Sequence, residues 1–271
     1  MLNFITWDFS PAIFTIGSFE VRYYGLLWAM SFWIGYVLVK KMFQKEGHDE
    51  ALLDGLLYSI IFGAVLGARL GHVFFYDWPY YSEHMDEILN IRQGGLASHG
   101  GVVGVLIGVA LFAKYKIKKS TIWVMDKIAV PGALAGFLIR LGNFLNSEIY
   151  GDQTDKPWGV IFIRDGQTVP THPAQLYEGL SYLLIFFLLY YLYHKKQMYL
   201  KEGKVFGVFL ITVFTVRIFV EYVKESQGGI ESYFGGAFST GQLLSMPFII
   251  VGLYLFFRKD PIHSTEQKNP S

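Results

Sequence analysis

The chain has 271 residues, of which 52% are hydrophobic and only 17% are charged. Soluble domains carry about 25% charged residues, so this deficit indicates a chain that lies in lipid. The net charge of +1 does not favour nucleic acid as a partner, and the absence of cysteine excludes disulfides, thiolate metal sites and a cysteine nucleophile.

Seven apolar segments are long enough to cross a membrane, because a span needs about 20 mostly apolar residues. They lack the polar face at 3.6-residue spacing that a solvated helix shows. We expect no removable signal peptide ahead of the first segment. The sequence therefore predicts an all-α polytopic membrane protein with about seven transmembrane helices, near residues 23–43, 52–76, 96–113, 122–145, 174–193, 205–223 and 235–257.

Basic residues are divided unevenly between the two sides of this predicted bundle. Lysine and arginine gather on one side, at residues 40–45, 114–119, 195–204 and 258–268, and the segments on the other side hold few of them. Cytoplasmic loops of membrane proteins carry the excess of Lys and Arg. We therefore expect the N-terminus outside and the C-terminus in the cytoplasm.

Residues 1–271 are expected to form a single membrane-embedded domain. Residues 77–97 contain aromatic side chains suited to the membrane interface, and residues 146–171 are rich in Gly, Asp and Pro. We predict that both segments are outer loops that form a small cap, and that the polar tail from about 259 to 271 is disordered.

Polar side chains gather in the outer halves of six of the predicted spans. An arginine in mid-span costs about 2.5–3.5 kcal/mol on insertion scales, so it usually faces a partner or a wet cavity. Arg140 and Arg217, with His99 at similar depth, indicate a functional site. Structural and functional roles both stay open for Arg69, and Glu221 lies one turn after Arg217, where it could hold that arginine. The residues that converge are Tyr24, Arg69, His72, His99, Arg140, Asn143, Asn146, His172, Gln175, Glu178, Arg217 and Glu221.

Glycines serve two predicted purposes. In the second, third and fourth spans they recur every four residues, a spacing that lets membrane helices approach closely. These glycines are Gly63, Gly67 and Gly71, then Gly104 and Gly108, and then Gly132 and Gly136. Gly94, Gly95, Gly100 and Gly101, which flank His99, lie where the chain enters the membrane. Because glycine permits close approach of the backbone, we predict that Gly100 and Gly101 contact a substrate.

Metal binding is disfavoured, because no histidine pairs with a second ligand at the usual zinc spacing and nearby arginines would repel a cation. The arginines favour an anionic substrate, and phosphate is the natural partner of paired guanidinium groups. A transporter or a binding protein for an anionic solute or lipid remains an alternative. A transporter would also predict internal repeats and broken helices near the membrane midplane.

Six sequence strings carry a family resemblance, and together they cover nearly the whole chain. The strings are VRYYG (21–25), GARLG (67–71), GGLASHGG (94–101), RLGNFLNSEIYG (140–151), HPAQLYE (172–178) and RIFVEYVK (217–224). In this order they resemble the bacterial prolipoprotein diacylglyceryl transferase family.

The resemblance implies a transferase in the bacterial cytoplasmic membrane. Such an enzyme moves a diacylglyceryl group from phosphatidylglycerol to the lipobox cysteine thiol of a prolipoprotein signal peptide, which forms a thioether and releases glycerol phosphate. No cofactor or metal is implied, and we expect a monomer.

The resemblance also implies roles for individual residues. Arg140 and Arg217 match the family's essential arginines, which would grip the lipid phosphate, and His99 matches the family's histidine and is the first candidate for the base. Tyr24 matches a further position linked to activity. The expected substrate-binding residues are Arg140, Asn143, Asn146, Glu148, Gly151, Glu221, Gly100 and Gly101.

Four positions depart from the family pattern. Ser147 replaces a glycine before Glu148, Lys224 stands where many relatives have arginine, and the remaining two departures are Ile139 and Val213.

Overall fold

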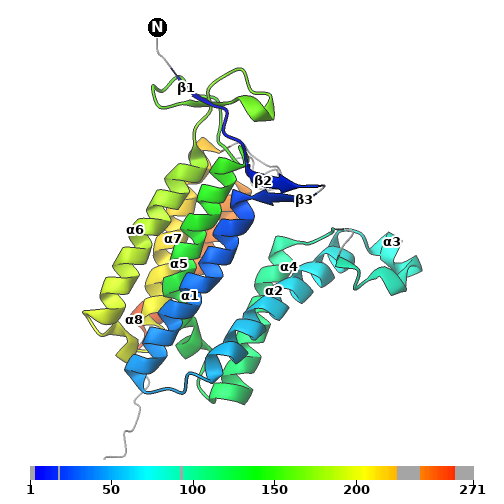
Figure 1. Ribbon diagram of the computed structural model, residues 1–271. Coiled ribbons are helices and arrows are strands. Elements are labelled where there is room, and N and C mark those ends of the chain that lie inside the picture. The colour runs from blue at the N-terminus through cyan, green and yellow to red at the C-terminus, as the bar shows by residue number, and fades with distance from the viewer. Residues whose placement is uncertain (1–3, 18, 92–93, 225–238, 260–271) are drawn as a thin grey trace, which may run out of the picture. The chain divides into compact units, whose positions relative to one another are not determined.

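The structure is a computed structural model that describes residues 4–17, 19–91, 94–224 and 239–259 (Figure 1). Within these residues, seven helices are long and apolar enough to cross a membrane, which confirms the predicted all-α polytopic fold. The helices are α1 (Tyr23–Glu46), α2 (Leu52–Phe75), α4 (Ser98–Phe112), α5 (Thr121–Leu145), α6 (Ala174–His194), α7 (Lys204–Val220) and α8 (Thr240–Phe257).

Within the described residues, helix α8 begins at Thr240. Ser239 caps α8, because its side chain accepts from the Gln242 backbone N–H while the Gln242 side chain accepts from the Ser239 backbone. This reciprocal capping box satisfies two amide donors at the helix start. The predicted start near residue 235 and the predicted disordered tail beyond 259 lie outside the described residues.

The chain packs as two compact units. The first contains the residues up to Gly35 and those from Ile128 onward, and the second contains the residues from Tyr36 to Lys127. Both boundaries fall inside helices, in α1 and α5. The single membrane-embedded domain and the outward N-terminus therefore stay predictions.

The first unit joins the start of α1 and most of α5 to α6, α7 and α8. Small residues set the spacing of α7 and α8: a Cβ on Gly207 would lie 2.9 Å from the Gly252 carbonyl, and the reverse distance is also 2.9 Å. Such contacts let membrane helices approach until their backbones nearly touch.

A cap covers one end of the first unit. Strand β1 (Ile5–Trp7) pairs in parallel with β4 (Val160–Phe162), and Trp7 packs on Phe144 near the end of α5 with ring centroids 4.5 Å apart. A hairpin of β2 (Ala12–Ile16) and β3 (Phe19–Arg22) precedes α1. The predicted loop at residues 146–171 is thus tied down by an N-terminal strand that the sequence did not indicate.

The second unit is built on close contact between α2 and α4. A Cβ on Gly63 would lie 2.5 Å from the Gly104 carbonyl oxygen, and a Cβ on Gly104 would overlap the Gly63 carbonyl. Gly100 meets Gly67 and Gly71 in the same way one turn earlier along α4. The predicted packing role of the four-residue glycine spacing is therefore present in the structure.

Arg69 has a structural role in this unit. Its side chain is buried, and its guanidinium donates to four backbone carbonyls in the segment that connects α2 to α4. The Tyr81 ring lies 4.8 Å from the guanidinium carbon. Because nearly every donor is used, Arg69 fastens the segment that contains α3 (Trp78–Glu83) to α2. The carbonyls belong to Glu87, Ile88, Gly94 and Gly95.

Candidate functional site

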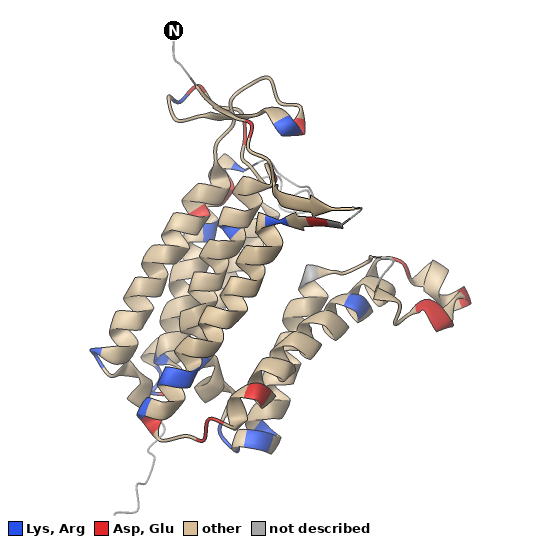
Figure 2. Cartoon of the chain, in the orientation of Figure 1, with Lys and Arg blue, Asp and Glu red and all other residues tan. Residues whose placement is uncertain are grey.

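A buried carboxylate, Glu178 on α6, joins two cations from neighbouring segments of the first unit. Only 1% of its side chain is exposed. One oxygen forms an ion pair with Nε of Arg140 on α5, and the other lies 3.1 Å from Nζ of Lys224, beyond α7. Charged residues are sparse along these helices (Figure 2). A buried carboxylate needs such partners, because an isolated charge would be costly in this environment.

The chain that leaves α5 forms a second group of polar contacts. Nη1 of Arg140 donates to the Asn143 side chain at 3.2 Å, and the amide of Asn143 donates to the Glu148 carboxylate at 2.7 Å. Asn146 donates to the same oxygen at 3.5 Å, and Gln175 on α6 donates to the Glu148 backbone carbonyl at 2.7 Å. The predicted residues Arg140, Asn143, Asn146 and Glu148 thus form one hydrogen-bonded group.

A tight backbone turn makes this group possible. Ser147 and Ile149 have φ angles of 57° and 59°, a left-handed conformation that glycine adopts most easily. Ser147 is also a position where the chain departs from the family's glycine. The turn reverses the chain directly after α5 and directs Glu148 back toward Asn143.

Two glycines bring further predicted residues to this end of the unit. A Cβ on Gly142 would lie 2.5 Å from Cδ2 of Tyr24, so the Tyr24 ring rests directly on α5. A Cβ on Gly151 would overlap the Val223 carbonyl and lie 3.0 Å from Cβ of His172. Gly151 therefore has a packing role, and its predicted contact with substrate stays a prediction.

Arg217 lies near Arg140 but lacks its partners. Arg140 and Arg217 both lie near Tyr182, where their charges and that of Glu178 act on its hydroxyl. Among the residues that the structure describes, none makes a side-chain hydrogen bond or ion pair with Arg217. Arg217 is half-buried. Both predicted arginines therefore lie close to Tyr182, and within the described part of the chain Arg217 has no side-chain counter-ion.

The remaining predicted residues belong to the second unit. His99 is the second residue of α4 and its side chain is exposed. Gly100 packs against α2, whereas a Cβ on Gly101 would make only ordinary contacts at 3.4 Å and beyond. The close packing gives Gly100 a structural role that the sequence analysis did not assign. The catalytic role of His99 and the substrate contacts of both glycines stay predictions.

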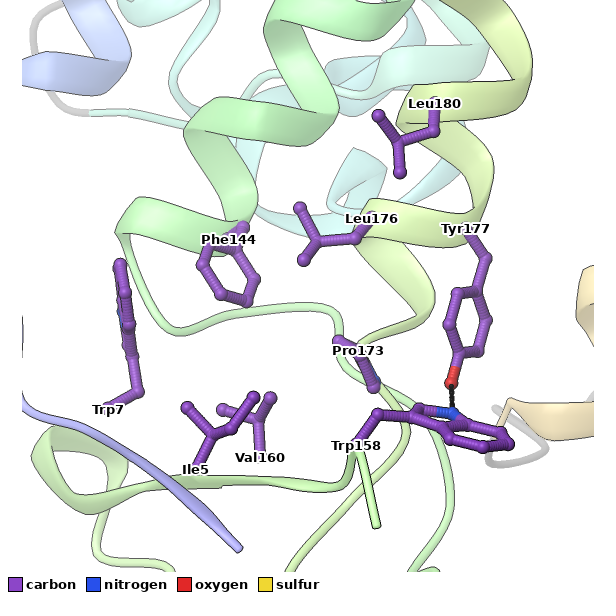
Figure 3. Close-up of a pocket in the computed structure, with 9 residues that line it drawn as sticks. All are labelled: Ile5, Trp7, Phe144, Trp158, Val160, Pro173, Leu176, Tyr177 and Leu180. Carbon is purple, nitrogen blue, oxygen red and sulfur yellow. Dashed lines mark hydrogen bonds between the residues drawn. The ribbon is translucent and has the colours of Figure 1, made fainter. Parts of the chain in front are cut away.

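An apolar cavity of about 540 Å³ lies between the cap and the start of α6 (Figure 3). Its walls include Trp7, Phe144 and Leu176. Nε1 of Trp158 donates a hydrogen bond to the Tyr177 hydroxyl at 2.8 Å, so these two polar groups of the wall satisfy each other. Phe144 follows Asn143 in sequence and Leu176 follows Gln175, so the same helix ends carry the cavity and the polar group. The sequence analysis missed this cavity, because its walls come from segments far apart in the chain.

Sequence analysis also underrated two residues in the polar group. Lys224 was noted only as a departure from the family pattern, and Tyr182 is one of several hydroxyl-bearing residues in an apolar span. The signal available for Lys224 was its position one residue past the RIFVEYV segment that holds Arg217 and Glu221.

Comparison with known proteins identifies the family. The family model described as prolipoprotein diacylglyceryl transferase matches residues 11–258. A phosphatidylglycerol–prolipoprotein diacylglyceryl transferase of Tolumonas auensis is 44% identical over 249 residues, which are 92% of this chain and 95% of the relative. Relatives of the same name are 42% identical in Chloroherpeton thalassium, over 94% of both chains, and 41% identical in Porphyromonas gingivalis, over 96% of both. The resemblance noted in the sequence is confirmed, and the chain belongs to the prolipoprotein diacylglyceryl transferase family.

Proposed function

We propose that this chain transfers a diacylglyceryl group from phosphatidylglycerol to the lipobox cysteine thiol of a prolipoprotein. The products are a thioether-linked lipid and glycerol phosphate. The names of the relatives support both substrates. The observation that carries the proposal is the pair of arginines near Tyr182, of which Arg217 has no partner among the described residues.

The two arginines suit a lipid phosphate. Arg140 is held in place by Glu178 and Asn143 and keeps 20% of its side chain exposed. Arg217 adds a second guanidinium, and guanidinium groups form short, charge-assisted hydrogen bonds with phosphate oxygens. A half-buried arginine without a counter-ion is costly in a membrane helix, and a bound phosphate would remove that cost.

The chemistry is a displacement at carbon. The sulfur attacks the glyceryl carbon bonded to the phosphate oxygen, so the S–C bond forms, the C–O bond breaks, and the electron pair leaves on that oxygen. A free thiol has a pKa of about 8.5 and is mostly protonated at neutral pH. A positioned base contributes about 10²–10⁴-fold. We assign the thiol proton to His99, and Arg140 and Arg217 stabilise the charge that grows on the leaving phosphate.

The other predicted residues complete the proposed site. The Tyr24 ring, from α1, rests on α5 at Gly142. The remaining residues contact the substrates or shape their site, and they are Asn146, Glu148, Gly151, Glu221, Gly100 and Gly101. The enzyme acts as a monomer in the bacterial cytoplasmic membrane, with this site toward the outer leaflet, where an exported precursor's cysteine emerges. No metal or organic cofactor is needed for the displacement.

Mass analysis of a lipobox peptide tests the function. Purified protein with phosphatidylglycerol should add one diacylglyceryl group to the peptide and release glycerol phosphate, and a peptide with serine in place of cysteine should stay unmodified. Both His99→Gln and Arg140→Ala should abolish the transfer while the protein remains in the membrane. An unmodified cysteine peptide with the wild-type protein would refute the proposal.

A further inference from the structure

The carboxylate of Glu221 rests on the first turn of α8 rather than on its own helix. A Cβ on Gly241 would lie 2.5 Å from Oε2 of Glu221 and still closer to Oε1. Any side chain at position 241 therefore has to displace the carboxylate. Gly241 is buried, so the contact lies inside the first unit.

Several contacts fix the start of α8 where Glu221 meets it. The capping box of Ser239 and Gln242 defines the first turn, and Nε2 of Gln242 donates to the Ile218 carbonyl of α7 at 3.4 Å. Further along, Gly207 and Gly252 set the spacing of the two helices. The surface that holds Glu221 is therefore part of a packed helix pair.

This placement separates Glu221 from Arg217. The two residues are four apart, a spacing at which acidic and basic side chains on one helix readily pair. In the structure the Glu221 backbone N–H donates to the Arg217 carbonyl, but in the described chain no ion pair joins the two side chains. The sequence-based idea that Glu221 holds Arg217 is therefore not what the structure shows. With the carboxylate held at α8, the Arg217 guanidinium has no anionic partner among the residues that the structure describes.

We propose that Gly241 is a positioning residue for the transfer reaction, because it lets α8 hold the Glu221 carboxylate away from Arg217 and so keeps that arginine available to the lipid phosphate. The inference rests on the proposed function. It gives α8, a span without a charged residue, a part in the site. A methyl group at position 241 would push the carboxylate off α8, within reach of Arg217, where it would compete with the phosphate.

A double-mutant cycle tests this inference on the purified full-length protein. Gly241→Ala should lower kcat/KM for phosphatidylglycerol by about 10- to 100-fold, as small displacements of catalytic groups do. Glu221→Gln should also lower it. If Gly241 acts through the Glu221 carboxylate, Gly241→Ala should have almost no further effect once Glu221 is glutamine. The double variant should then differ from Glu221→Gln by no more than about twofold in kcat/KM, which is within the usual scatter of such cycles.

Gly252→Ala is the matched control. Its Cβ would crowd the same pair of helices, at 2.9 Å from the Gly207 carbonyl, but lies well away from Glu221 along α8. It should lower thermal stability as Gly241→Ala does, and leave kcat/KM of the folded enzyme within about twofold of wild type. An equal loss of kcat/KM in both single variants would overturn the inference in favour of simple helix packing.

Two other results would also overturn it. They are unchanged kcat/KM in Gly241→Ala, and an equal effect of Gly241→Ala with glutamate or glutamine at 221. If Gly241→Ala fails to fold, Glu221→Asp decides, because it withdraws the carboxylate from α8 but keeps its charge. A larger loss of kcat/KM in Glu221→Asp than in Glu221→Gln would then support the proposal, because only the aspartate keeps a charge that can compete with the phosphate. A loss no larger than that of Glu221→Gln would end it. In all of these tests the wild-type protein is active; its inactivity would instead refute the proposed function.

Discussion

Nζ of Lys224 lies 3.1 Å from Glu178, whose other oxygen is already paired with Arg140. Glu178→Gln would leave both cations without their shared anion in a largely enclosed place. We expect a loss of stability of about 1–3 kcal/mol, the cost of leaving buried groups unsatisfied, and a fall in transfer activity as Arg140 loses its orientation. Thermal unfolding in detergent and the peptide assay measure the two effects.

Glu20→Gln is the control for this prediction. Glu20 pairs with Arg22 at 2.7 Å, but both side chains are exposed. Exposed ion pairs contribute only about 0–1 kcal/mol, so this variant should differ little from wild type. A Glu178→Gln variant as stable and active as Glu20→Gln would show that the buried carboxylate is dispensable.

Gly142→Ala should disturb the site through Tyr24. The added methyl group would press on the Tyr24 ring, which has to move away from α5. A shift of this size at a catalytic group lowers the rate by about 10- to 100-fold. Steady-state kinetics of lipid transfer provide the measurement.

Gly132→Ala is the matched variant on the same helix. Its Cβ would lie 3.8 Å from the Phe209 ring, an ordinary contact. It should keep wild-type kinetics, because the methyl group fits the available space. Equal kinetics in the two glycine variants would mean that the position of Tyr24 does not matter for transfer.

Arg69→Lys should loosen the segment between α2 and α4. A lysine has three donors on one nitrogen and cannot reach the separate carbonyls that the planar guanidinium joins. We expect a loss of about 1–3 kcal/mol from the unsatisfied carbonyls. Hydrogen exchange should become faster at residues 94–97, where Gly94 and Gly95 adopt positive φ angles.

The corresponding control is Arg164→Lys, which changes an exposed arginine paired with Asp8 at 2.9 Å. Its exchange pattern should match that of the wild type. Unaltered exchange at residues 94–97 in Arg69→Lys would contradict the structural role of Arg69.

His48 should make stability depend on pH. Burial lowers the pKa of His48; Glu46 opposes the shift, and Lys119 and Lys127 add to it. The unfolded chain then binds a proton more readily, at its ordinary pKa of about 6.5, than the folded chain does. The stabilisation is complete above that value and is lost as pH falls toward the lowered pKa of the folded state.

His48→Phe tests this dependence, because it keeps a ring beside Phe43 and Trp123 and removes the titrating group. Thermal unfolding between about pH 5 and pH 7.5 should then vary less with pH than in the wild type. His84→Gln, at an exposed ring stacked on Tyr80, should keep the wild-type profile. Identical profiles in all three proteins would remove His48 as the source.

The spans were predictable because each is a long apolar run, but their ends depend on local contacts. The capping box at Ser239 was readable as serine three residues before glutamine, a pattern that marks a helix start. Gly100 continues the four-residue series of Gly104 and Gly108, so its packing role was also present in the sequence. Gly100 also lies in the GGLASHGG string beside His99, and on that ground it was predicted to contact a substrate rather than to pack.

Other features need the folded chain. Arg69, Arg140 and Arg217 look alike in sequence, since each is an arginine in an apolar segment. Their neighbours separate them: Arg69 meets four carbonyls, Arg140 meets a carboxylate, and Arg217 meets no side-chain partner in the described structure. Tertiary contacts of this kind leave no periodic trace in the sequence.

The seam between α2 and α4 limits how this family member can change. Main-chain atoms of Gly63 and Gly104 set its width, so no exchange of side chains can make it narrower. A side chain at position 63 or 104 would meet the backbone of the facing helix and force the two helices apart there. Substitutions in these helices are therefore tolerated mainly on the surfaces that face away from the seam. The constant distance between α2 and α4 also fixes the position of the first turn of α4, which contains His99, relative to α2.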